Sequence, residues 1–179
     1  EYVLRYLREI KTLGFSIVFI STAKLSSHET DRIRPVCSDV ILRENTGLDF
    51  GSWAAGFAKY GSEVAGRLLL VNDSVYGPIG SSLTTAFERL TALPADFYGM
   101  VESIEPTPHL QSWFLLFEPW VVRSSEFRAI LQRSFSTMTK REIIENGELG
   151  FSRTLVKAGF KYQALYPVSY THLTLPTIL

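Results

Sequence analysis

The chain has 179 residues, of which 46% are hydrophobic and 20% are charged, which suits one globular domain with a sizeable core. Lysine plus arginine and aspartate plus glutamate number 18 each, so no net field favours nucleic acid, and we expect no nucleic-acid partner. Cys37 is the only cysteine, which excludes an internal disulfide and a cysteine-rich zinc site. We therefore expect a cytoplasmic protein, which could work at the inner face of the membrane.

The most apolar run bears on membrane insertion, and the two ends of the chain bear on how much of it belongs to the domain. The most apolar run, Trp113 to Val122, is interrupted by Glu118 and Pro119 and is far shorter than the roughly twenty residues of a membrane span, so no transmembrane segment is expected. The chain starts without methionine inside a helix-like pattern, so we expect its natural N-terminus to lie further upstream. Residues 168–179 lack helical periodicity and a cap, and they resemble a translated sequencing-adapter read-through. We predict one domain over residues 1–167 and a non-native tail over 168–179.

Helical and strand patterns alternate along the domain. Apolar residues recur at helical spacing from Tyr2 to Leu13, and Gly14 follows at the position of a C-terminal cap. Strands are expected at 15–21, 39–43, 67–71, 96–100 and 111–117, and helices at 26–31, 52–60, 82–93, 124–134 and 150–158. This alternation predicts a layered α/β domain with a mainly parallel central sheet.

Ligands of open parallel sheets bind beyond the carboxyl ends of the strands, and two segments there are candidates for a site. In residues 43–53, two glycines let the backbone approach a ligand, and Asp49 offers an acceptor beside a helix start. An ordinary turn, with Asp49 as a helix cap and Trp53 in the core, fits equally well. The second segment is residues 71–78, where Asp73 could bind a ligand or cap a turn.

Two further groups of residues have a polar character that suits chemistry. His109 follows a proline-rich loop, and Gln111 and Trp113 are expected to alternate on a strand, where an amide beside an aromatic ring suits a sugar. A buried, hydrogen-bonded histidine and a packed tryptophan are the alternatives. The other group is Glu142, Glu145 and Glu148, whose three-residue spacing would place them near one helical face. Gly147 disfavours a continuous helix there, and a solvated surface is the alternative.

Four of these segments resemble the rhamnan synthesis protein F family in sequence and in order. They are NxGxDFGSW from Asn45, LLLVNDSVYGP from Leu68, His109-Leu110-Gln111-Ser112, and GELGFS from Gly147, and the resemblance covers Tyr2 to about Tyr166. It implies a fold like that of GT-A nucleotide-sugar transferases with its usual first strand missing. It also implies inverting transfer of a sugar, with dTDP-rhamnose as the expected donor, to a glycan or lipid-linked acceptor of cell-wall polysaccharide or lipopolysaccharide synthesis.

The resemblance also implies roles for individual residues. Asn72-Asp73-Ser74 stands where GT-A enzymes carry an Asp-x-Asp signature, so Asp73 is expected to hold Mg²⁺ or Mn²⁺ against the donor diphosphate. Asn45, Gly47, Asp49, Asn72, Ser74, His109 and Gln111 are expected to contact substrate. Glu148 is the expected general base, with Glu145 in reserve.

A non-catalytic glycan-binding or scaffolding module on the same fold is the main alternative, because the signature contains only one acid. A nucleotide-binding oxidoreductase is disfavoured, because the chain lacks a GxGxxG turn.

Overall fold

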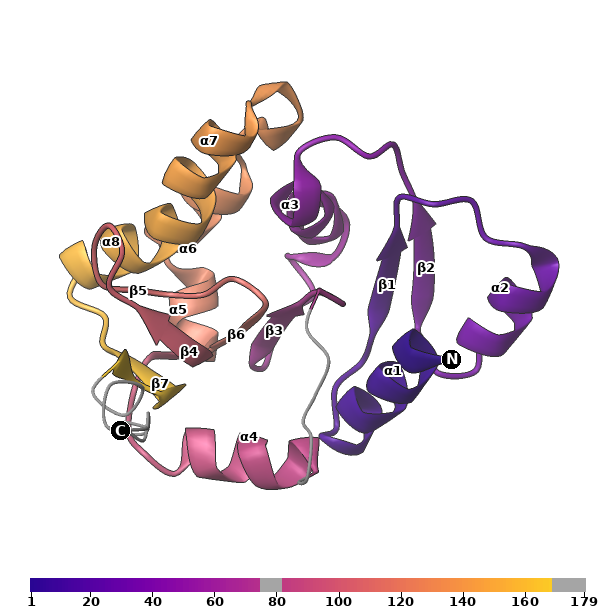
Figure 1. Ribbon diagram of the computed structural model, residues 1–179, viewed down its shortest axis with the longest axis horizontal. Helices are drawn as coiled ribbons and strands as arrows, with labels where there is room; N and C mark the ends of the chain where they lie inside the picture. The colour runs from indigo at the N-terminus through magenta and orange to yellow at the C-terminus, as the bar shows by residue number, and fades with distance from the viewer. Residues whose placement is uncertain (75–81, 169–179) are drawn as a thin grey trace, which may run out of the picture.

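The computed structural model describes residues 1–74 and 82–168, which form a mixed α/β structure (Figure 1). Its helices are α1 Tyr2–Thr12, α2 Ser27–Ile33, α3 Leu48–Tyr60, α4 Leu83–Thr91, α5 Pro119–Arg123, α6 Ser125–Leu131, α7 Lys140–Ile143 and α8 Leu149–Lys157. Its strands are β1 Val18–Ser21, β2 Asp39–Leu42, β3 Leu68–Val71, β4 Phe97–Ser103, β5 His109–Leu110, β6 Phe114–Phe117 and β7 Tyr162–Tyr166. Within the described part of the chain, no helix has the length and apolar character needed to cross a membrane.

The main sheet is mixed, so the expectation of a mainly parallel sheet was wrong. Its strands lie in the order β3-β6-β4-β5, with β7 beside β4, and every pair is antiparallel except β4 with β7. One reason is connection length, because a chain that turns within a few residues, as it does between β4 and β5, returns antiparallel to the strand it left, and β5 and β6 both run back along β4. The strands β1 and β2 form a separate parallel pair.

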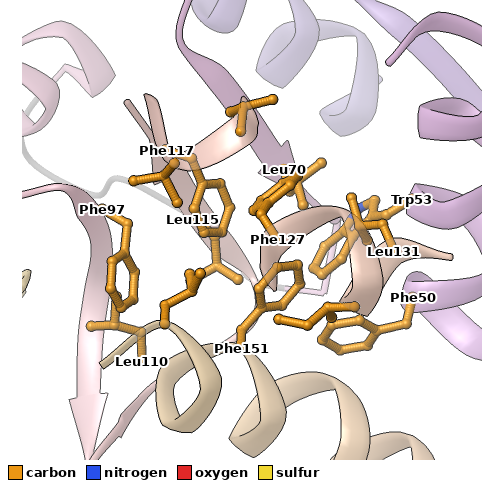
Figure 2. Packing of buried hydrophobic residues seen from close by; sticks show 14 of the residues in the cluster. Phe50, Trp53, Leu70, Phe97, Leu110, Leu115, Phe117, Phe127, Leu131 and Phe151 are labelled. Atoms are coloured by element: carbon orange, nitrogen blue, oxygen red, sulfur yellow. The ribbon is translucent and has the colours of Figure 1, made fainter. Parts of the chain in front are cut away.

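The main sheet is buried on both faces. Along β6, Leu115 and Phe117 belong to one apolar cluster and Phe114 and Leu116 to the other, as the two-residue period of a strand requires. The first cluster packs the sheet against α3, α6 and α8, and aromatic rings dominate it, with Phe127 in contact with both Phe117 and Phe151 (Figure 2). The second cluster joins the sheet to α1 and α4.

Local signals placed most helix ends correctly. Gly14 follows α1 in the left-handed conformation at φ +87°, as expected for its cap position. The side chain of Ser26 accepts the backbone N–H of Glu29 and the Glu29 carboxylate accepts that of Ser26, which fixes the start of α2. Helix α3 begins at Leu48, four residues before its predicted start, because Gly47 provides the left-handed turn at its N-terminus.

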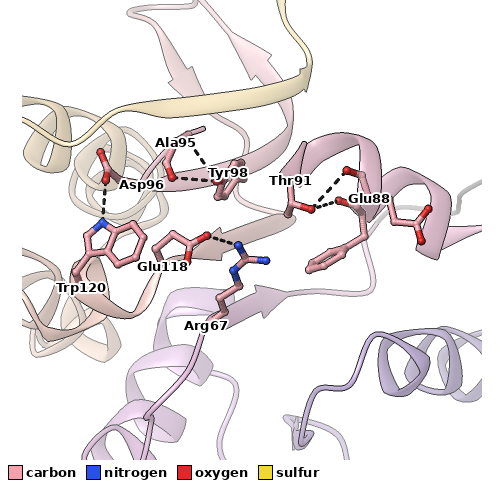
Figure 3. A network of polar contacts seen from close by, with 9 residues as sticks. Arg67, Glu88, Thr91, Ala95, Asp96, Tyr98, Glu118 and Trp120 are labelled. Atoms are coloured by element: carbon pink, nitrogen blue, oxygen red, sulfur yellow. Dashed lines mark hydrogen bonds and ion pairs between the residues drawn. The ribbon is translucent and has the colours of Figure 1, made fainter. Parts of the chain in front are cut away.

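A polar network closes the sheet at the end where β3 begins (Figure 3). The buried carboxylate of Glu118, just after β6, pairs with Arg67, just before β3, at 2.6 Å. The indole N–H of Trp120 donates to Asp96 at 2.8 Å, and Asp96 also accepts the backbone N–H of Lys161. These bonds tie the ends of four strands, β3, β6, β4 and β7, together and leave the opposite end of β3 for the candidate site.

Two predictions fall wholly or partly on residues that the structure does not describe. The turn from Val75 to Pro78 lies outside the described residues, as does the predicted tail from residue 169 onward. Val168, the first residue of that tail, is described, and its backbone N–H donates to Glu102 at 3.1 Å.

Candidate functional site

The two candidate segments, residues 43–53 and the described residues 71–74 of the second, meet at the carboxyl end of β3. The side-chain amide of Asn72 donates to the Asp49 carboxylate at 2.8 Å, and the Trp53 indole N–H donates to the carbonyl of Val71 at 3.2 Å. Trp53 is buried, which confirms its expected place in the core. The fold therefore fixes Asp49, in the first turn of α3, beside the residue that follows β3.

Asp49 is half-buried, and its surroundings change the pKa of its carboxyl. Burial raises the pKa of its carboxyl above the usual range, and the negative charge of Asp73 raises it further, while the hydrogen bond from Asn72 opposes both effects. Asp49 does not cap α3, because Gly47 occupies that position. Two carboxylates that repel one another at a strand end form a place where a cation would be stabilised.

The turn that leads into α3 is built around an arginine. Arg43 donates to the Thr46 carbonyl and to the Ser52 hydroxyl, which holds the turn against the helix. A Cβ at Gly51 would come within 2.3 Å of the Thr46 carbonyl oxygen, so only glycine permits this approach. Gly47 is buried and Asn45 is exposed, so of these two expected substrate contacts Asn45 is the one that a ligand can reach.

Asp73 and Ser74 are exposed directly after β3. The backbone N–H of Ser74 donates to the Asn72 side-chain oxygen at 3.1 Å, so the turn-forming alternative applies to Asn72 rather than to Asp73. Within residues 1–74 and 82–168, no group of three histidine, cysteine or acidic side chains is arranged to hold a metal ion. A cation here would fit one or two carboxylates completed by phosphate oxygens and water, as Mg²⁺ accepts, rather than a cage made by the protein.

Glu148 is held in a defined orientation by the segment between β5 and β6. Its Oε2 accepts the backbone N–H of Ser112 at 3.1 Å and the Ser112 hydroxyl. Its side chain is 27% exposed, so the protein fixes the carboxylate without burying the whole side chain.

His109 lies directly behind this carboxylate. It is in β5 rather than in the loop predicted before a strand, it is only 3% exposed, and its Nε2 lies 3.5 Å from Glu148 Oε1. Its Nδ1 lies 2.7 Å from the carbonyl oxygen of Thr107. The histidine is therefore both buried with a hydrogen-bond partner and in contact with the expected base.

Gln111 and Trp113 do not alternate on a strand, contrary to prediction. Residues 111–113 connect β5 to β6, which begins only at Phe114. These residues interrupt the strand because the register changes there: β5 pairs with the far end of β4, at 102–103, and β6 with its beginning, at 97–99. The backbone N–H of Gln111 donates to Val101 at 3.0 Å, and the ring of Trp113 packs edge-on against Phe114.

The three glutamates do not share a helical face. Glu142 accepts hydrogen bonds from Thr139 at the start of α7, Glu145 pairs with Arg153 at the surface at 2.7 Å, and Glu148 points to Ser112. The physical reason is a π-helical turn over Ile144–Glu148, which makes α7 and α8 one continuous helical run and shifts the residue phase between them. The doubt that Gly147 raised about helical continuity was also misplaced.

Gly147 and Gly150 serve close packing and not backbone freedom. A Cβ at Gly147 would lie 2.9 Å from the ring of Phe50, and one at Gly150 would lie 3.3 Å from the Arg133 guanidinium. Neither glycine has a positive φ. Arg133 in turn donates to the carbonyl of Asn146 at 2.6 Å, which satisfies an acceptor of the π-helical turn.

Two links join the Asp49 and Glu148 clusters into one site. On one side, the backbone N–H of Asn72 donates to the carbonyl of Trp113, the neighbour of Ser112. On the other side, Phe50, the neighbour of Asp49, lies against Gly147, the neighbour of Glu148. All four segments that were singled out in the sequence therefore meet at one end of the sheet.

Sequence reasoning gave no role to Ser112 or Thr107, although both orient site residues. Ser112 lay within a recognised segment, but its partner Glu148 is 36 residues away, and no local pattern indicates such a contact. Thr107 acts through its backbone carbonyl, which every residue type possesses.

Comparisons with known proteins agree with the resemblance seen in the sequence. The family model described as rhamnan synthesis protein F matches residues 17–174. Uncharacterized protein y4gN of Sinorhizobium fredii is 29% identical over 171 residues, which are 93% of this chain and 45% of that protein. Virulence protein VirA of Vibrio anguillarum is 32% identical over 139 residues, which are 74% of this chain and 44% of that protein. The chain thus spans less than half of these curated relatives, and no solved structure matches it.

Proposed function

Because the chain belongs to the rhamnan synthesis protein F family, we propose that it acts in the synthesis of rhamnan or another bacterial polysaccharide, as a glycosyltransferase. The donor is a nucleotide-sugar, with dTDP-rhamnose the first to test, and the acceptor is a glycan or lipid-linked glycan of the cell wall or lipopolysaccharide. The proposed reaction inverts the anomeric centre, on a fold related to GT-A transferases.

The observation that carries this proposal is the orientation of Glu148. A general base must be fixed in place and reachable by the hydroxyl whose proton it removes. Ser112 donates two hydrogen bonds to Oε2 of Glu148 and none to Oε1, and the side chain of Glu148 is partly exposed. Glu145 lacks this arrangement, because its carboxylate is at the surface with Arg153.

In the proposed reaction, Glu148 removes the proton of an acceptor hydroxyl while that oxygen forms a bond to the anomeric carbon. The bond from that carbon to the diphosphate oxygen breaks, and its electron pair leaves with the diphosphate. A divalent cation such as Mg²⁺ or Mn²⁺ would supply charge stabilisation for this leaving group. Asp73, with Asp49 beside it, would hold the cation, and Asn45, Asn72 and Ser74 offer polar groups to the donor.

The competing function is glycan binding without catalysis. It is considered because only one exposed acid, Asp73, directly follows β3. The two functions differ in what they recognise, so isothermal titration with dTDP, UDP and a rhamnose-containing oligosaccharide, each with and without Mg²⁺, tests the proposal. A transferase binds a nucleoside diphosphate, and Mg²⁺ strengthens that binding. Binding of the oligosaccharide without either nucleotide would favour the glycan-binding module instead.

A further inference from the structure

The backbone carbonyl of Thr107 determines which ring nitrogen of His109 carries a proton, and therefore which nitrogen faces Glu148. The Thr107 carbonyl can only accept a hydrogen bond, so His109 Nδ1, 2.7 Å away, must carry a proton. In the neutral ring, the other nitrogen, Nε2, then has a lone pair and no proton. That lone pair is the group that lies 3.5 Å from Glu148 Oε1.

The two oxygens of Glu148 are therefore not equivalent. Oε2 accepts the backbone N–H and the hydroxyl of Ser112, and these two donors orient the carboxylate. Oε1 faces a nitrogen lone pair, an arrangement that leaves a place for one proton between two acceptors. A proton delivered to Oε1 can be shared with or passed to Nε2 once the pair closes to hydrogen-bond distance, as catalytic contacts do when substrate binds.

In the described residues, the other polar groups near His109 bond to partners other than its ring. On β4, Ser103 pairs with His109 through the strand register, while Glu102 accepts the hydroxyl of Tyr162. On α8, Ser152 accepts the backbone N–H of Leu110, and Arg153 is paired with Glu145. Of the described charged groups, Glu148 is the one whose carboxylate lies within 4 Å of a ring nitrogen.

We propose that His109 is a positioning and proton-holding residue, which receives through Glu148 the proton that the acceptor hydroxyl loses. This inference rests on the proposed function. During transfer the proton moves from the hydroxyl to Oε1 and on to Nε2, and it returns to water through Glu148 after the diphosphate has left. At 3% exposure, His109 acts through Glu148 and does not touch the acceptor itself.

Nitrogen-15 NMR of histidine-labelled protein tests the geometry without any turnover. We expect neutral His109 to carry its proton on Nδ1, with Nε2 bare, and a His109→Asn variant identifies its signals. The exposed His28 on α2 gives a reference in the same spectrum. A neutral His109 with its proton on Nε2 would overturn the proposal.

Kinetics of the protein expressed from its own gene test the proton's path. His109→Gln keeps a polar group near Glu148 but cannot take a proton, and we expect kcat to fall by on the order of tenfold, part of the 10²- to 10⁴-fold that positioned bases contribute. Donor KM should not change, and His28→Gln should match the wild type.

The pH profile separates proton holding from simple orientation. A residue that only orients Glu148 leaves the pH dependence of kcat unchanged when it is replaced, whereas a residue that shares the transferred proton does not. We expect the acid limb of kcat to change its position in His109→Gln. Full kcat with an unmoved limb in that variant would contradict the proposal. Absence of transfer by the wild type would refute the proposed function, and the NMR result would still decide where the proton sits.

Discussion

The ring of Phe50 lies against Gly147 so closely that a single added methyl group would meet three of its carbons at 2.9 Å. Phe50 belongs to the first turn of α3 beside Asp49, and Gly147 belongs to the π-helical turn beside Glu148. This contact sets the spacing between the two acidic clusters of the candidate site. The glycine is a packing requirement, and its loss should disturb both stability and site geometry.

Gly147→Ala should destabilise the fold by about 1–3 kcal/mol, the usual cost of overpacking a well-packed core. Gly66→Ala is the matched control, because a Cβ at the exposed Gly66 meets nothing within 4 Å. Urea unfolding of both variants measures the difference. Equal midpoints for the two variants would show that the Phe50 contact does not constrain the fold.

Asp73→Asn should weaken dTDP binding and remove its dependence on Mg²⁺ or Mn²⁺, because the amide cannot supply the charge that a divalent cation requires. Asp31→Asn, on the exposed surface of α2, is the control. Calorimetric titration of dTDP with and without metal gives the comparison. Unchanged affinity in Asp73→Asn under both conditions would leave Asp73 without a role at the diphosphate.

Much of this arrangement follows from local sequence, and the rest depends on distant contacts. The helical spacing from Tyr2 and the cap at Gly14 predicted α1, and the apolar run at 67–71 predicted β3. Strand direction was not predictable in the same way, because it depends on which strands the short connections bring together. The π-helical turn has no pattern of its own, so the separate roles of Glu145 and Glu148 could not be foreseen from their spacing.

Asp49→Asn should change the pH dependence of stability. The pKa of Asp49 is raised in the folded protein, chiefly by burial, so its favourable contribution to stability is present at low pH and is lost as pH rises through that pKa. The variant should therefore be more stable than the wild type at neutral pH, and the difference should shrink as the pH falls below the raised pKa. Urea unfolding at a series of pH values measures it.

Asp39→Asn provides a control with the opposite sign. The hydrogen bonds from Lys59 and Tyr60 lower the pKa of Asp39 to about 2, so its contribution is present above the pKa of the unfolded chain and is lost as pH falls. This variant should be less stable than the wild type at neutral pH. If Asp49→Asn behaved in the same way, the carboxylate of Asp49 would be a stabilising group and not a strained part of the site.

The central claim is that Glu148 removes the proton of the acceptor, and sugar transfer by Glu148→Gln tests it most directly. Turnover should fall by about 10²- to 10⁴-fold while calorimetric affinity for the donor nucleotide stays near that of the wild type, because the amide keeps the size of the side chain but cannot act as a base. Glu63→Gln, at an exposed position, controls for the substitution itself. Wild-type turnover in Glu148→Gln, or loss of turnover in Glu145→Gln alone, would contradict the assignment.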